Sequence, residues 1–160
     1  MMMTDEKKQA YTVRITQANP TQLCVILYEI LLDYLGEARS AYSEGDRETF
    51  RSALDKSRGA VTQLLGSVNS GQPISETLRE LYAFSLREIA KADAGNRVEP
   101  LYGVEKCIQQ LRDAYAQISK LDARGQVLAN AQTVYAGLTY GRNSLNENLA
   151  DQGNSRGFRV

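Results

Sequence analysis

Residues 16–35, TQANPTQLCVILYEILLDYL, carry the strongest structural signal in this chain. Asn19, Pro20 and Gln22 form a typical helix start, with an N-cap residue, a proline at the first helical position and the partner of a capping box. Nearly every residue from 23 to 35 is apolar. Because a surface helix normally has one apolar face, a helix that is apolar nearly all round needs neighbours on several sides.

The polar positions of this helix fall on one thin stripe, formed by Gln22, Glu29, Asp33, Gly36 and Glu37. The apolar run is too short to span a bilayer and contains two carboxylates, so we expect no membrane insertion. Nineteen basic residues balance nineteen acidic ones, which gives no net field that would attract nucleic acid. The first ten residues lack the apolar stretch of a signal peptide, so we expect a soluble, cytoplasmic protein.

The composition argues against an enzyme. The chain has no histidine, which removes histidine-based metal sites and Ser–His or Cys–His nucleophile pairs. Its glycines form no phosphate-binding loop, and its carboxylates lie on predicted solvent faces. Cys24 and Cys107 are far apart and fall in apolar helical patterns, which favours small buried hydrophobic residues over a redox or disulfide role. We therefore expect no catalytic residues, no metal and no cofactor.

Three further helices are predicted from apolar residues at three- and four-residue steps. They cover residues 47–68, 75–94 and 100–120. Asp46 and Ser75 are the predicted N-caps of the first two, and Asn96 follows the end of the second. Gln63 falls on the polar side of the 47–68 helix, so we expect it to face solvent.

These four helices, joined by short connections, predict an all-α fold, an antiparallel four-helix bundle. We divide the chain into an extended N-terminal segment at 1–18, the bundle at 19–121 and a C-terminal extension at 122–160. The extension is rich in Asn, Gly and Ser but has dispersed apolar residues. It is either a partly disordered tail or an irregular, partly helical segment that docks on the bundle.

Three ordered motifs resemble the family of the flagellar export chaperone FliS. The first is QANPTQLCVILYEILLDYLGEA, where the matching positions are Pro20, Leu23, Leu27, Tyr28, Glu29 and Ala38. The second is LRELYAFSLREIAKAD, where they are Leu78, Leu81, Tyr82, Phe84 and Ala92. The third, LYGVEKCIQQLRDAY, has Tyr115 where the family usually has Trp.

The resemblance implies a non-enzymatic chaperone with a four-helix bundle fold. Proteins of that family bind the C-terminal segment of flagellin in the cytoplasm, prevent premature polymerisation and assist delivery to the flagellar type III export gate. An apolar flagellin tail is a polymerisation hazard in the cytosol, and grooves beside an unusually apolar helix would bury it temporarily.

The flagellin-binding groove candidates are Val25, Ile26, Tyr28, Leu32 and Tyr82. Since the stripe through Leu23, Leu27, Ile30, Tyr34 and Ala38 is assigned to the core, the remaining faces of the first helix are left for cargo. Tyr28 and Tyr82 have an alternative role as hydrogen-bonded structural tyrosines.

Two other groups of residues could cover the groove. In the family, an N-terminal segment can lie over the empty groove, and Tyr11 and Ile15 are placed to do this; alternatively they fix the chain's entry into the first helix. In the C-terminal extension, Val134, Tyr135 and Leu138 are candidates for docking on the bundle in cis.

Two other interaction roles remain open besides flagellin binding. An adaptor or regulator bundle would bind a different flagellar or regulatory partner, such as the export gate. A self-associating bundle would use the extra apolar face in a homodimer. We expect a monomer or a weak homodimer.

Overall fold

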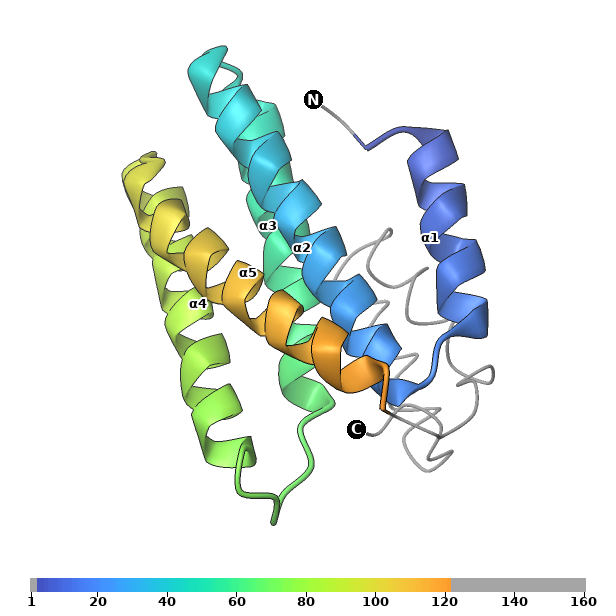
Figure 1. The fold of residues 1–160 in the computed structure, drawn as a ribbon. Helices are drawn as coiled ribbons and strands as arrows, with labels where there is room; N and C mark the ends of the chain where they lie inside the picture. Colours follow the sequence, from blue (N-terminus) through green and yellow to red (C-terminus); the bar gives the residue numbers. More distant parts are fainter. Residues whose placement is uncertain (1–2, 122–160) are drawn as a thin grey trace.

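The part of the chain that the computed structural model describes, residues 3–121, consists of five α-helices (Figure 1). The helices are α1 (Asp5–Gln17), α2 (Pro20–Ser43), α3 (Arg47–Gly66), α4 (Ser75–Gly95) and α5 (Glu99–Ser119). For these residues the predicted all-α class is confirmed. The C-terminal extension, with Val134, Tyr135 and Leu138, lies outside the described residues.

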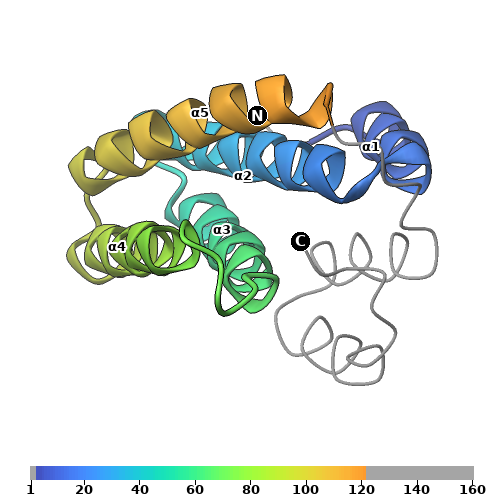
Figure 2. The ribbon, with the colours of Figure 1, turned by 60° about the horizontal axis from the view of Figure 1, so that its bottom comes forward.

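Four of the helices contact one another in a closed ring. α2 packs on α3, α3 on α4, α4 on α5, and α5 returns to α2. Figure 2 shows α2 and α5 side by side in one layer above α3 and α4, with α1 beside α2 at the edge of that layer. The prediction of four helices is therefore wrong by one, because α1 adds a fifth that packs on α2.

The helix at the N-terminus also corrects the prediction of an extended segment at 1–18. α1 starts after Thr4, whose hydroxyl accepts a hydrogen bond from the Lys7 amide at 3.1 Å. Asp5 and Glu6 occupy its first turn, where carboxylates favour the helix dipole. Of the residues in α1, Tyr11 and Ile15 are buried. This sparse apolar content explains why periodicity did not reveal the helix.

The start of α2 has the predicted capping box. The Asn19 side chain accepts from the Gln22 amide at 2.8 Å, and the Gln22 side chain accepts from the Asn19 amide at 2.9 Å. Asp46 caps α3 as predicted, accepting from the Thr49 amide at 3.1 Å, and hydrogen bonds from the side chain and the amide of Thr49 lower the pKa of Asp46. Ser75 does not cap α4. It is the first helical residue, and its hydroxyl donates to the carbonyl of Asn69.

The core forms around α2. Its predicted core stripe is buried throughout, which confirms that assignment for Leu23, Leu27, Ile30, Tyr34 and Ala38. Residues on other sides of α2 are buried as well, so the helix is covered over most of its circumference. Among residues 3–121, no helix combines the length and the apolar character needed to cross a membrane.

Candidate functional site

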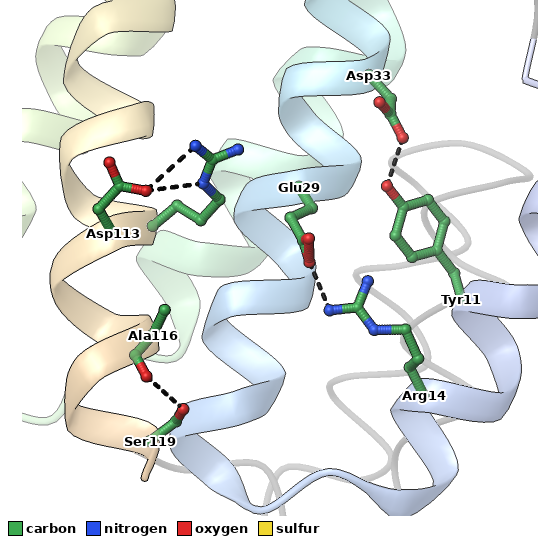
Figure 3. A network of polar contacts seen from close by, with 8 residues as sticks. Tyr11, Arg14, Glu29, Asp33, Asp113, Ala116 and Ser119 are labelled. Atoms are coloured by element: carbon green, nitrogen blue, oxygen red, sulfur yellow. Dashed lines mark hydrogen bonds and ion pairs between the residues drawn. The ribbon is translucent and has the colours of Figure 1, made fainter.

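The candidate site is the side of α2 that lies against α1. Three polar contacts between described residues join the two helices there, and Figure 3 shows two of them, Tyr11 with Asp33 and Arg14 with Glu29. The Lys7 ammonium lies 3.0 Å from an Asp33 oxygen, and the Tyr11 hydroxyl donates to the other oxygen of Asp33. One turn away, the Arg14 guanidinium contacts Glu29 at 2.5 Å. The polar stripe of α2 is thus the surface that receives α1.

These polar contacts are only partly shielded from water. The side chains of Lys7 and Arg14 are 50% and 46% exposed, and ion pairs with this exposure add little stability. The Tyr11 hydroxyl is more protected: burial, followed by the hydrogen bond to Asp33, raises the pKa of Tyr11. Tyr11 and Ile15 supply the buried apolar part of α1. The attachment of α1 to α2 therefore rests on a small contact.

Open clefts lie at both ends of α1, and three groove candidates line them. Val25 and Ile26 line a cleft of about 350 Å³ together with Gln17, at the C-terminal end of α1. Leu32 lines a second cleft of about 370 Å³ together with Lys7, near the N-terminal end of α1. Val25 and Leu32 are half-buried, whereas Ile26 is 3% exposed.

Tyr28 and Tyr82 lie elsewhere, inside the bundle. Their hydroxyl groups are 2.6 Å apart and form a buried hydrogen bond that links α2 to α4. The ring of Tyr115 from α5 meets Tyr28 edge to face, with centroids 5.6 Å apart. Burial raises the pKa of both Tyr28 and Tyr82. The structure thus contains the hydrogen bond expected if these two tyrosines are structural, and it does not bring them together with Val25, Ile26 and Leu32.

Tyr82 also borders a small cavity of about 50 Å³ beside the connection between α3 and α4, together with Cys24 and Tyr115. Cys24 is buried, as predicted, whereas Cys107, also expected to be buried, is half-buried, and no disulfide joins them. The described residues contain no group of three or more His, Cys, Asp or Glu side chains arranged to hold a metal ion.

Sequence reasoning missed two features of the candidate surfaces. The first is the contact of α1, although Lys7, Tyr11 and Arg14 have the spacing of one helical face and could have matched the acidic stripe of α2. The second is Gln63, which was expected to face solvent but is fully buried on α3. Its residue type indicated exposure, and only the packing of the helix reveals its burial.

Two comparisons with known proteins found similar sequences. A family model described as "Flagellar protein FliS" matches residues 3–122. The chain is also 25% identical over 103 residues to a protein of Bacillus subtilis (strain 168) named "Flagellar secretion chaperone FliS". That match covers 64% of this chain and 77% of the relative.

Replacing Asp33 should loosen α1 while leaving the rest of the bundle intact. Asp33→Ala removes the acceptor shared by Lys7 and Tyr11, so we expect the free energy of opening α1 to fall by about 1 kcal/mol. Amide hydrogen exchange should become several-fold faster across residues 5–17 and stay unchanged in α3 and α4. Asp113→Ala is the control, because the Asp113 carboxylate contacts Arg112 on its own helix (Figure 3). Equal exchange in α1 for both variants would contradict this role of Asp33.

The Tyr28–Tyr82 hydrogen bond should be visible in a double-mutant cycle. Tyr28→Phe leaves the Tyr82 hydroxyl buried without its partner, so each single Phe variant should lose about 1–3 kcal/mol of unfolding free energy. The double variant should lose less than the sum of the two. Urea unfolding followed by circular dichroism measures these values, with the exposed Tyr102→Phe as a neutral control. Strict additivity would show that the two hydroxyls are not coupled.

Proposed function

The chain belongs to the FliS family, and on this basis we propose that it is a cytoplasmic, non-enzymatic chaperone of flagellar assembly that binds the C-terminal segment of flagellin. In this role it keeps flagellin from polymerising early and assists its transfer to the export gate. The name of the Bacillus subtilis relative, a flagellar secretion chaperone, supports the same general role.

The observation that carries the proposal is the way α2 is covered. α3 and α5 pack on two sides of this apolar helix, and α1 lies on a further side through a small contact. Helix-in-groove recognition needs apolar surface whose cover can be exchanged, and Val25, Ile26 and Leu32 supply it beside the polar stripe that α1 contacts. A flagellin segment with an apolar helical face would replace α1 on α2 and bury its own apolar residues there.

α1 has the properties of an exchangeable cover. It has 13 residues, and a helix of this length is marginal in water when isolated. Its ion pairs to α2 are partly exposed, and its buried side chains are Tyr11 and Ile15. Once released, α1 loses the contacts that stabilise its helix. Its departure would expose Ile26 and join the two clefts that Val25 and Leu32 line.

The energetics of such an exchange suit a cargo that must later be released. Ordering a flexible segment on binding typically costs ~2–5 kcal/mol of the interaction energy. Displacing α1 adds a further cost, so the net affinity stays below that expected from the buried area. We infer a 1:1 complex, because one α2 face is available in each chain.

Calorimetric titration with a flagellin C-terminal fragment tests the proposal. We expect 1:1 binding with a negative heat-capacity change, because the fragment buries apolar surface. Leu32→Asp places a charge in the groove at a half-buried position and should weaken binding at least ~10-fold, the effect of about 1.4 kcal/mol.

The matched control for this titration is Val13→Asp. Val13 is 51% exposed on α1 and is not among the α1 residues buried in the fold, so this charge should leave the affinity unchanged. A flagellin fragment without its C-terminal segment should not bind. If the wild-type protein fails to bind the complete fragment, or if Val13→Asp weakens binding as much as Leu32→Asp, the proposed function or its location on α2 is contradicted.

A further inference from the structure

The side chain of Gln63 on α3 is fully buried, and within residues 3–121 neither its Nε2 nor its Oε1 atom has a hydrogen-bond partner. Nearly all buried polar groups in folded proteins are paired, because an unpaired one has lost its hydrogen bonds to water and gained nothing. An amide in this state lowers the stability of the free protein. Its presence here therefore requires an explanation that folding alone does not supply.

The position of Gln63 is fixed by its neighbours on α3. Lys56 lies two turns earlier on the same side of the helix, and its ammonium is 5.8 Å from the centre of the Tyr34 ring on α2. Gln63 thus lies on the flank of α3 that is turned toward α2. α2 and α3 run in opposite directions through a short connection, so Gln63 is level with the first turns of α2.

Gly59, which is itself buried, places no side chain beside this amide. It lies one turn before Gln63, and helical side chains lean toward the N-terminus, so the Gln63 side chain extends over the turn of Gly59. A Cβ atom added at Gly59 would meet no described atom within 4 Å. A glycine in the middle of a helix costs stability, and it allows another backbone to approach closely.

We propose that Gln63 is a specificity-determining anchor for the cargo peptide, with its amide bound to the peptide main chain across Gly59. This inference rests on the proposed function, because the peptide is the C-terminal segment of flagellin. A primary amide offers both a donor and an acceptor, which matches a free main-chain N–H and C=O. The amide is unpaired in the free protein and paired in the complex, so it favours the bound state.

The type of main chain that Gln63 can recognise is restricted. Inside a helix the backbone groups are already bonded to each other, and only the ends have free N–H or C=O groups. Gln63 therefore binds a helix end or an extended stretch of the cargo, while the apolar face of α2 binds its helical part. Since the amide is covered in the free protein, the Gln63 side chain must rotate outward as the peptide arrives.

Replacing Gln63 with methionine tests the assignment in the full-length chain. Gln63→Met keeps the length of the side chain and removes the amide, so the melting temperature of the free protein should rise by a few degrees. Its affinity for the flagellin C-terminal fragment should fall about 10-fold, because the peptide groups lose their partner. Gln110→Met, at an exposed position on α5, should change neither quantity.

Opposite changes in stability and affinity are what identify the anchor. If Gln63→Met leaves the melting temperature unchanged or lowers it, or leaves the affinity unchanged, the assignment is overturned. If the difference in affinity disappears once residues 126–160 are deleted, the amide serves the C-terminal extension and the assignment to cargo is also overturned. Failure of the wild-type protein to bind the fragment would instead contradict the proposed function itself, and the inference with it.

Discussion

The need to cover α2 on all sides determines the architecture of this protein. α2 is too apolar to lie at a surface, so α3 and α5 bury two of its sides and α4 closes the ring around the core. The remaining side carries the polar stripe with Glu29 and Asp33, and α1 binds there through ion pairs and two buried side chains. A strong apolar core and a weakly held cover therefore meet on the same helix.

Two buried polar groups in the interior differ in whether their hydrogen bonds are satisfied. Tyr28 and Tyr82 satisfy each other inside the bundle, and their hydrogen bond joins helices that are not neighbours in the ring. Gln63 is equally buried, but its amide has no partner in the described part of the chain. The first arrangement stabilises one fold, whereas the second reduces the stability of the free protein and favours a state in which the amide has a partner.

Local chemistry explains which parts of the structure could be predicted from sequence. The starts of α2 and α3 were predictable because Asn19, Gln22 and Asp46 cap them through residues three positions away. α1 was missed because its helix depends on contact with a distant acidic stripe rather than on its own apolar pattern. Gln63 was missed for a related reason, since burial of a polar side chain is decided by tertiary packing. The grouping of Val25, Ile26 and Leu32 near α1, apart from Tyr28 and Tyr82, likewise required the three-dimensional arrangement.

Hydrogen exchange in the presence of a flagellin C-terminal fragment tests most directly whether α1 and cargo exchange on α2. If the fragment replaces α1, amides in residues 5–17 should exchange faster in the complex than in the free protein, because the released helix is too short to persist alone. Amides of α2 should exchange more slowly at the same time. Stronger protection of residues 5–17 in the complex, or exchange equal to that of the free protein, would contradict displacement of α1 by cargo.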